Sequence, residues 1–555
     1  MESFTSEIIS SSLMYASEEM GIVLRNSAYS PNIKDRMDHS CALLDREGRL
    51  IAQAEHIPVH LGSLPWGLGR TLQHMRREGM QISVGDMIAV NNPYLSGTHL
   101  NDITVIRPVF HKGKLAAFAA NKAHHSDVGG KVPGSIPFDA EELFQEGFII
   151  DPVKLMKKGR TDVSFIRLLS SNSRDPYQRR GDIRAQIAAN LLGETRLRAL
   201  IEKYGIRSFE DANETAIQRS REITEHRLSE MKDGISGAED YMELPDGRKV
   251  VLRVRLKKKG RRLTADYEGT AEQVRTPLNA VFGVTLSGVY FALRAIAGTD
   301  MVTNDGCFSP VDVRVPERSL LNPEFPFPVS AGNTETSMRN VDVLFRAFAG
   351  FAPGKVPAAC GGSMNNVMIG GVSHGSTWSF YETNGVGSGA YDGGDGVSGI
   401  QCNMTNTMNT PAEIVELDYP IEIVRYELRT GSGGAGRWRG GCGIDRAYRA
   451  LEKMTLTVVA ERENTFPYGL EGGEDGKGSE FHLMKNSSPG TWKRVPSKCS
   501  IEMEQGDIFL IRTAGGGGYG NANERTLTDR INDERQGLTQ AVSPPVRFSE
   551  NREIV

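Results

Sequence analysis

The spacing of apolar residues predicts a chain that begins and continues with long amphipathic helices. Over residues 5–25 apolar positions recur at helical intervals. The residues that this spacing puts on or near one side of the predicted helix are Ile8, Ile9, Met14, Met20, Ile22 and Val23. A second helix is predicted over 64–78, where Gly79 ends the pattern. Two further long helices are predicted over about 182–204 and 209–232. We interpret this last pair as a helical layer.

Strand patterns fill the sequence between and after these helices. The runs 40–45 and 49–53 flank Gly48 and predict a hairpin, because glycine readily adopts the conformation that a tight turn needs. Further strands are predicted at 87–90, 104–109, 115–123, 249–255, 261–267, 422–428 and 454–459. The change from helical to β texture near residue 233 predicts a domain boundary there.

Candidate chemistry gathers in two short segments, SGTHLND at 96–102 and NKAHHSD at 121–127. Imidazole nitrogen and carboxylate oxygen at this density suit a divalent cation such as Zn, Mn or Fe. The pattern predicts that His99 and Asp102 lie in a loop between strands, and that His124 and His125 lie just past the end of one. The alternative is a solvated His99–Asp102 pair beside ordinary edge-strand histidines, and spacing alone leaves both interpretations open.

The predicted fold class is α+β and multidomain, with a mixed α/β N-terminal metal-binding region, a helical layer and a β-rich C-terminal half. The expected units are 1–180 (N-terminal α+β metal-site domain), 181–233 (helical layer), 234–411 (mixed β and Gly-rich domain) and 412–555 (β-rich C-terminal domain). Segment 355–400 is dense in glycine, but interspersed Met, Val, Trp and Tyr predict a packed loop layer and not a flexible linker.

Composition narrows the class of function. The net charge of -4, from 65 Lys+Arg against 69 Asp+Glu, gives no basic field for nucleic acid. The acidic start of the chain and the lack of a run of about eighteen apolar residues predict a cytoplasmic protein with no membrane partner. Six cysteines without CxxC spacing predict reduced thiols. The glycines at 515–518 lack the Lys-Ser/Thr pair of a phosphate-binding loop, so we interpret them as structural turns.

Several longer motifs occur in a fixed order along the chain. The N-terminal ones are DHSCALLD at 38–45, IPVHLG at 57–62, NNPY at 91–94, GTHLND at 97–102 and HHSDVGG at 124–130. The later ones are GNTET at 332–336, MTNT at 404–407, NTPAE at 409–413, YELR at 426–429, SGGAGRWRGGCG at 432–443 and TAGGGGYG at 513–520. Together they resemble the hydantoinase B/oxoprolinase family over nearly the whole chain.

The resemblance implies a metal centre and a partner. Its metal-ligand positions match Asp38, His99, Asp102 and His124, which would hold Zn, Mn or Fe. His60, His125 and Asp127 are candidates for orienting those ligands or transferring protons, with purely structural hydrogen bonding as the open alternative. Family members work with a hydantoinase A-type ATPase subunit, which binds ATP and Mg, and the expected assembly is a hetero-oligomer with two or more of each chain.

The resemblance also sets the choice of reaction. One class hydrolyses cyclic amides such as hydantoins, oxoproline or lactams after phosphorylation by the partner, and the compact length favours this class. The other class attaches bicarbonate-derived carbon to a ketone, as in acetone and acetophenone carboxylases. A non-catalytic, metal-stabilised scaffold is a third interpretation. Glu335 and Arg339 are further candidates, for contact with an anionic intermediate.

Overall fold

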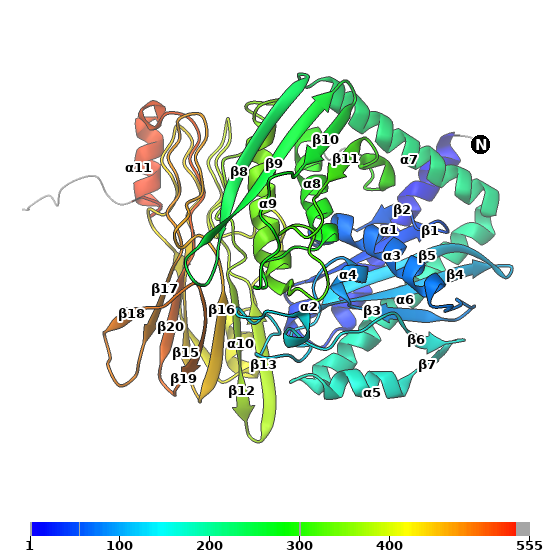
Figure 1. Cartoon of the computed structure of the whole chain (residues 1–555), viewed down its shortest axis with the longest axis horizontal. Coiled ribbons are helices and arrows are strands. Elements are labelled where there is room, and N and C mark those ends of the chain that lie inside the picture. The colour runs from blue at the N-terminus through cyan, green and yellow to red at the C-terminus, as the bar shows by residue number, and fades with distance from the viewer. Residues whose placement is uncertain (1–2, 55, 299–300, 540–555) are drawn as a thin grey trace, which may run out of the picture.

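A seven-stranded antiparallel sheet forms the centre of the N-terminal half in the computed structural model, which describes residues 3–54, 56–298 and 301–539 (Figure 1). In spatial order its strands are β2 (Leu50–Gln53), β1 (His39–Asp45), β5 (Lys114–His124), β4 (Asp102–His111), β3 (Met87–Val90), β6 (Val153–Lys157) and β7 (Arg160–Thr161). The predicted hairpin of β1 and β2 is confirmed, with Gly48 at φ 89° in its turn.

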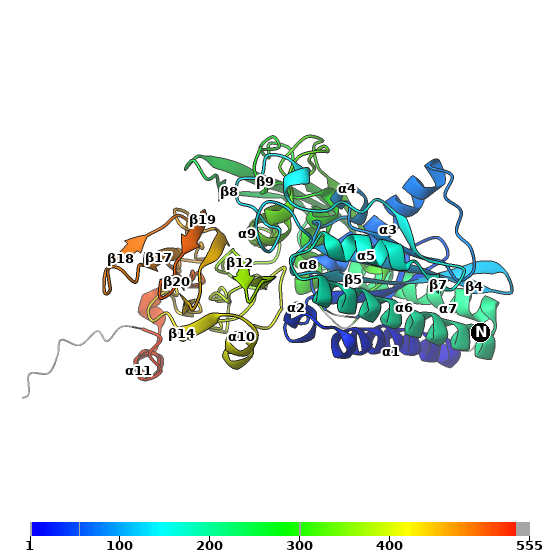
Figure 2. The ribbon, with the colours of Figure 1, turned by 90° about the horizontal axis from the view of Figure 1, so that it is seen from below.

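Helices cover both faces of this sheet (Figure 2). On one face lie α1 (Ser3–Ser27), α6 (Pro176–Tyr204) and α7 (Ile206–Ser229), and on the other lies α3 (His60–Arg77). Cys41 and Leu43 of β1 pack towards α1 and α6, whereas Ala42 and Leu44 pack towards α3. Because successive strand residues face opposite sides, a strand between two helical layers is buried along its whole length. The first residue of β4, Asp102, and the last residue of β5, His124, are likewise shielded from water.

The buried side of α1 differs in part from the predicted one. Its core positions, spaced by three or four residues, are Ile9, Leu13, Ala16, Met20 and Leu24. Met14 and Ile22 were placed near the buried side by the sequence pattern, but they are 42% and 57% exposed. The pattern was ambiguous because α1 carries apolar residues on more than one side.

A four-stranded sheet and two helices follow in the middle of the chain (Figure 1). The sheet runs in the order β11 (Val311–Arg314), β10 (Arg262–Asp266), β9 (Lys249–Lys259) and β8 (Gly234–Glu243). Leu252, Val254 and Leu256 of β9 are buried in one core cluster with α8 (Phe282–Ala297) and α9 (Ser337–Phe348). Strand β8 begins directly after the predicted boundary at 233, but β8, α8 and α9 were not predicted.

The C-terminal part is built from two further sheets that share one apolar core. One sheet has the order β13 (Ser376–Glu382), β12 (Asn366–Ser373), β16 (Met454–Val459) and β19 (Lys498–Met503). The other has the order β14 (Ile421–Leu428), β15 (Ile444–Ala450), β20 (Ile508–Arg512), β17 (Glu480–Met484) and β18 (Trp492–Arg494). The predicted α+β class with a β-rich C-terminal half is confirmed, while the division into four units stays a prediction.

The remaining helices are short. They are α2 (Pro31–Lys34), α4 (Pro93–Ser96), α5 (Val163–Ser171), α10 (Ala412–Asp418), α11 (Leu527–Arg535), the 3-10 turns η1 (Leu143–Gln145), η2 (Asp305–Cys307) and η4 (Ala522–Glu524), and the π-helix η3 (Gly332–Thr336). Across the described ranges, none of the helices is long and apolar enough to cross a membrane. The end of the predicted last unit, 540–555, lies outside the described residues.

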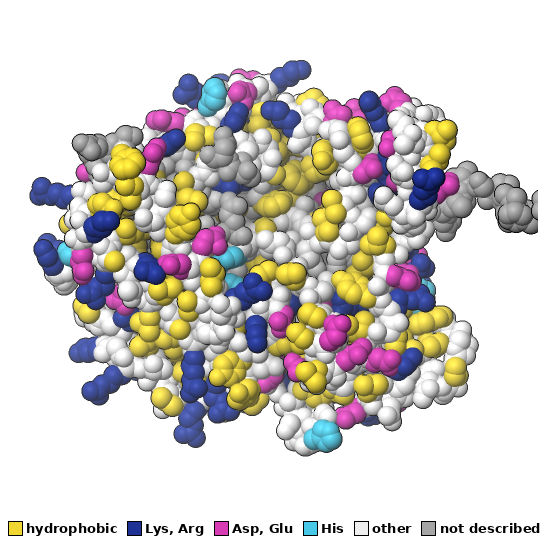
Figure 3. Space-filling view, turned by 180° about the vertical axis from the view of Figure 1, so that it is seen from behind, with side chains coloured by type: hydrophobic (Ala, Val, Ile, Leu, Met, Phe, Trp, Pro, Cys, Tyr) yellow, Lys and Arg dark blue, Asp and Glu magenta, His cyan; other side chains and the backbone are white. Residues whose placement is uncertain are grey.

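The glycine-rich segment is a packed layer, as predicted. Backbone segments approach so closely that a Cβ on Gly387 would lie 1.9 Å from the carbonyl oxygen of Gly441. The amide groups of 515–518 all donate to backbone carbonyls of other segments, so they are not free to bind an anion. All six cysteines are free thiols. On the face opposite that of Figure 1, positive and negative side chains are interspersed (Figure 3).

Candidate metal centre

Two neighbouring strands bring the central carboxylate and one imidazole together. Asp102 is the first residue of β4 and His124 is the last residue of β5, and the two stand opposite each other in the antiparallel register. The sequence predicted Asp102 in a loop and His124 just past a strand. Both predictions are wrong by a small amount, because each residue is the end residue of its strand. His99 comes from the turn before β4, after Gly97 ends α4 in the left-handed conformation at φ 87°.

Three possible ligand atoms converge at this point. His99 Nε2 lies 3.2 Å from Asp102 Oδ1, His124 Nδ1 lies 3.3 Å from the same oxygen, and the two nitrogens are 3.1 Å apart. All three residues are buried, and their ligand atoms lie within 4.8 Å of one another. Within the described residues this is the one group of three or more His, Cys, Asp or Glu that meets this criterion.

The spacing of these atoms fits a metal ion. Ligands about 2.0–2.1 Å from a tetrahedral centre are separated from each other by about 3.3 Å. The three measured separations, 3.1, 3.2 and 3.3 Å, are close to that value. Asp102 Oδ1 is buried and has no hydrogen-bond donor among the described residues, so its lone pairs are available to a cation. The donor set of two imidazoles and a carboxylate suits Zn, Mn or Fe.

Asp38 stands at the edge of this group. It immediately precedes β1, and its Oδ2 lies 4.0 Å from His124 Nδ1. It is 8% exposed and lines the same cavity as Asp102 and His124. A movement of less than about 1 Å would bring this carboxylate to the ligand spacing. The structure thus brings Asp38, His99, Asp102 and His124 into one place, with Asp38 the least closely held.

Neighbouring groups fix the orientation of the rings and the carboxylate. His99 Nδ1–H donates to the carbonyl oxygen of Ser330 at 3.1 Å, so Nε2 keeps its lone pair for the centre. His60, the first residue of α3, donates from Nε2 to Asp102 Oδ2 at 3.3 Å. The Ser40 hydroxyl in turn lies 2.9 Å from His60 Nδ1. His60 therefore orients the carboxylate of Asp102.

The electrostatics keep Asp102 ionised. Burial alone would raise the pKa of Asp102, but the nearby rings of His99 and His60 hold it well below its ordinary value. Burial alone would lower the pKa of His99, but Asp102 and the Ser330 carbonyl raise it overall. Burial lowers the pKa of His124 and raises that of Asp38. The centre thus holds at least one carboxylate anion, which a cation would neutralise.

A narrow cavity of about 20 Å³ opens beside Asp102 and His124. This is room for about one water-sized group. The cavity is lined by Asp38, Ile57, Val59, His60, Asp102, His124, Asn333, Thr334, Met364, Tyr381, Thr383 and Thr405. Asn333 belongs to the π-helix η3, and its buried Oδ1 has no hydrogen-bond donor among the described residues. A small polar site therefore adjoins the candidate ligands.

Two of the candidate residues lie apart from the cluster. His125 Nε2 bonds to Gln186 Oε1 of α6 at 3.0 Å. Asp127 accepts from the Arg174 guanidinium at 2.9 Å and from backbone amides of its own loop and of Arg174. These contacts agree with the structural alternative that the sequence left open for both, and their part in orienting ligands or transferring protons stays a prediction.

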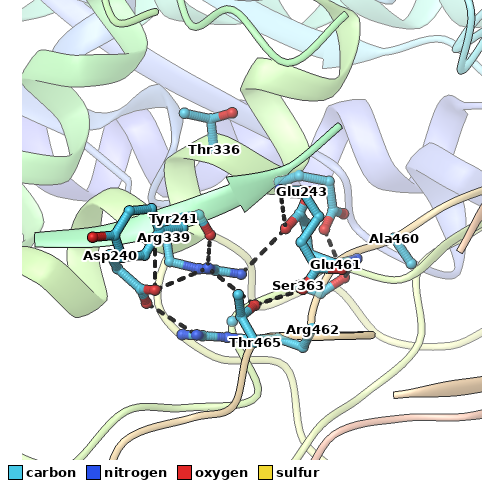
Figure 4. A network of polar contacts seen from close by, with 12 residues as sticks. Asp240, Tyr241, Glu243, Thr336, Arg339, Ser363, Ala460, Glu461, Arg462 and Thr465 are labelled. Carbon is cyan, nitrogen blue, oxygen red and sulfur yellow. Dashed lines mark hydrogen bonds and ion pairs between the residues drawn. The ribbon is translucent and has the colours of Figure 1, made fainter. Parts of the chain in front are cut away.

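Arg339 and Glu335 are both fully buried. Figure 4 shows Arg339 within a network of polar contacts. The Arg339 guanidinium pairs with Asp240 and Glu461, each at 3.3 Å. Glu335 accepts from Ser363 Oγ at 2.6 Å and from Asn366, and burial raises its pKa to about 8. Both side chains are therefore used in contacts within the protein, and contact of either with an anionic intermediate stays a prediction.

Sequence reasoning missed two contributors to the site. The ring of Tyr381, from β13, stacks on His124 with centroids 4.6 Å apart. Ser330 acts through its backbone carbonyl, which any residue type would provide. The GNTET motif, which begins two residues after Ser330, was the signal that could have pointed to this segment, because it forms the π-helix that lines the cavity.

Comparison with known proteins gives a consistent picture. The model of the hydantoinase B/oxoprolinase family matches residues 2–522. An uncharacterised protein of Methanocaldococcus jannaschii is 44% identical over 98% of this chain and 95% of its own length. The 5-oxoprolinase 1 of Arabidopsis thaliana is 35% identical over 92% of this chain, which matches 41% of the plant protein. The chain thus spans about two fifths of that relative.

Two solved structures share the fold. The ATP-dependent caprolactamase from Pseudomonas jessenii is 28% identical, with a TM-score of 0.91 over 97% of this chain and 95% of the other. A nucleotide-free acetone carboxylase is 18% identical, with a TM-score of 0.90 over 97% of this chain and 78% of the other. At 18% identity the second likeness is one of fold alone.

Proposed function

Because the chain belongs to the hydantoinase B/oxoprolinase family, we propose that it is the metal-dependent subunit of an ATP-dependent cyclic amide hydrolase. A partner ATPase of the hydantoinase A type phosphorylates the amide oxygen, with ATP and Mg on the partner, and this chain opens the activated C–N bond. The observation that carries the proposal is the convergence of His99, Asp102 and His124 on one point. The likeness to a caprolactamase favours an amide as substrate.

The division of labour has a chemical reason. An unstrained cyclic amide has a weakly electrophilic carbonyl and a strongly basic oxygen, and phosphorylation of that oxygen corrects both defects. A divalent cation in the site would supply Lewis acidity and lower the pKa of water towards neutrality. The cavity of about 20 Å³ beside the ligand atoms leaves room for a water-sized nucleophile.

Each residue of the site has a distinct part in this proposal. His99, Asp102 and His124 hold the cation, and Asp38 is the fourth ligand after a small movement. His60 donates a hydrogen bond to Oδ2 of Asp102, which leaves Oδ1 of Asp102 for the cation. Since His125 and Asp127 bond to α6 and to Arg174, we assign them the structural alternative.

The first test concerns the partner. We expect the purified chain alone to hydrolyse neither ATP nor a lactam, because the amides of 515–518 are used within the fold and an unactivated lactam is a poor electrophile. Adding the A-type subunit and ATP should give turnover of a lactam or hydantoin from a substrate panel. The measurement is product formation and ADP release with each component omitted in turn. Ring opening by the chain alone would contradict the proposal.

The second test follows the oxygen atoms and separates hydrolysis from carboxylation. We expect the new carboxylate to carry an oxygen atom from labelled solvent water, and turnover to be independent of bicarbonate. Mass spectrometry of the product in ¹⁸O-water checks this. Strict dependence on bicarbonate, with labelled carbon in the product, would replace the hydrolase with a ketone carboxylase. If the chain binds a metal but the complex converts no substrate of either class, the result would favour the third interpretation, a non-catalytic, metal-stabilised scaffold.

A further inference from the structure

Glu146 joins two segments that are far apart in the sequence. Its Oε1 accepts hydrogen bonds from the backbone amides of Val329 and Ser330, both at 2.9 Å, and from the Ser330 hydroxyl at 2.8 Å. The side chain is fully buried. Three donors on one buried oxygen atom fix the position of this backbone, because breaking any of these hydrogen bonds would leave a buried polar group without a partner.

Glu146 is itself held firmly. It follows the 3-10 turn η1, whose Leu143 is buried in the main core, and its amide donates to the Leu143 carbonyl at 3.0 Å. Gly130 packs so closely against it that a Cβ there would lie 2.6 Å from the Glu146 carbonyl oxygen. Because the backbone of Glu146 is fixed, its side chain can hold the Val329–Ser330 backbone in one position.

The held segment reaches the candidate metal centre directly. The Ser330 carbonyl accepts the Nδ1–H of His99 at 3.1 Å. A ligating imidazole needs its second nitrogen held, because that contact sets both the tautomer and the ring orientation. In this site the acceptor is a backbone carbonyl, and its position depends on what holds the segment that carries it.

We propose that Glu146 is a positioning residue for the metal centre. By fixing the Val329–Ser330 backbone it holds the Ser330 carbonyl against Nδ1–H of His99 and keeps Nε2 of that ring directed at the cation. The inference rests on the metal centre of the proposed function, and it adds a residue 47 positions from His99 along the chain (146 minus 99).

The test measures metal affinity and not turnover. The chain is stripped with a chelator and titrated with Zn²⁺ and with Mn²⁺ against a competing chromophoric chelator. Glu146→Ala should bind metal about 10–100-fold more weakly, the range found when the groups that orient a metal ligand are removed. Glu146→Gln keeps an acceptor oxygen at the same reach and should stay close to the wild type. Glu146→Asp, which is one methylene shorter, should fall between them and serves if Glu146→Ala does not fold.

Asp182 offers a matched control. Its buried Oδ1 also accepts two successive backbone amides, those of Tyr29 and Ser30 at 2.8 and 3.0 Å. It makes no contact with the second nitrogen of His99 or His124. Asp182→Ala should lower the free energy of unfolding and leave metal affinity unchanged. Chemical unfolding of each stripped variant separates stability from affinity.

The outcomes are distinct. Weakened binding in Glu146→Ala, with recovery in Glu146→Gln and no change in Asp182→Ala, supports the inference. If the wild type binds metal and Glu146→Ala binds it with the same affinity, the role of Glu146 is overturned and the metal centre stands. A wild-type chain that binds neither metal would overturn the metal centre, and the role of Glu146 with it.

Discussion

Replacing His99 with alanine should remove the metal and abolish turnover in the reconstituted complex. The substitution deletes Nε2, one of the three converging ligand atoms, and leaves Asp102 and His124 as the close pair. Because loss of a group that only orients a ligand already costs 10–100-fold in affinity, we expect loss of a ligand to cost more than about 100-fold. Metal content by elemental analysis and product formation in the same preparations are the measurements.

The loss should be accompanied by a modest loss of stability. His99 is fully buried, and its ring helps to keep the buried carboxylate of Asp102 ionised, so its removal leaves a polar group less well compensated. We expect a cost of about 1–3 kcal/mol in the free energy of unfolding. A position in a turn before β4 does not make the substitution harmless.

His125 provides the matched control, because it is an equally buried histidine next to His124 whose ring bonds to Gln186 of α6. His125→Gln should keep the metal content of the wild type, although its stability falls. If His99→Ala retained stoichiometric metal, or if His125→Gln lost it, the ligand set would have to be redrawn around different residues.

The elements with clear local periodicity were predictable from the sequence. Strand β3 was predicted with its observed bounds, and the ends of α3 and α6 were predicted to within one residue, but both helices begin several residues earlier than predicted. Helix α8 was not, because it is buried on nearly all sides and its sequence therefore has no alternation of polar and apolar faces. The π-helix η3 was missed for a different reason, since one extra residue per turn leaves no periodic signal in five residues.

The candidate ligands were within reach of sequence reasoning, whereas their supports were not. A hairpin between the predicted strands at 104–109 and 115–123 brings Asp102 and His124 towards the same end of the sheet. The exact register, with Asp102 opposite His124, depends on a bulge between Val109 and Phe110 that the sequence did not reveal. The contact between His99 and Ser330 joins residues 231 positions apart and uses a backbone carbonyl, so no residue type marks it. Glu146 was missed for the same reason, because its partners are chiefly backbone amides.

Arg339 was a candidate for contact with an anionic intermediate, and its position in the fold predicts a different effect of substitution. Its guanidinium is fully buried, pairs with Asp240 and Glu461 and donates to the Tyr241 carbonyl (Figure 4). Arg339→Ala would leave Glu461, itself fully buried, with Lys498 as its remaining cationic partner at 2.8 Å. Removal of one member of a buried ion pair costs about 3–5 kcal/mol, because the other charge stays behind in a medium of low polarity.

We therefore expect Arg339→Ala to lower the free energy of unfolding by about 3–5 kcal/mol, measured from urea unfolding curves. The matched control is Arg494→Ala, which breaks a pair with Glu463 at 3.1 Å in which the arginine side chain is 56% exposed. That pair should contribute less than about 1 kcal/mol, because water screens exposed charges and replaces the lost contact. An Arg339→Ala protein with unchanged stability but a raised KM for the substrate would show instead that Arg339 binds the intermediate, and that the buried network opens when substrate arrives.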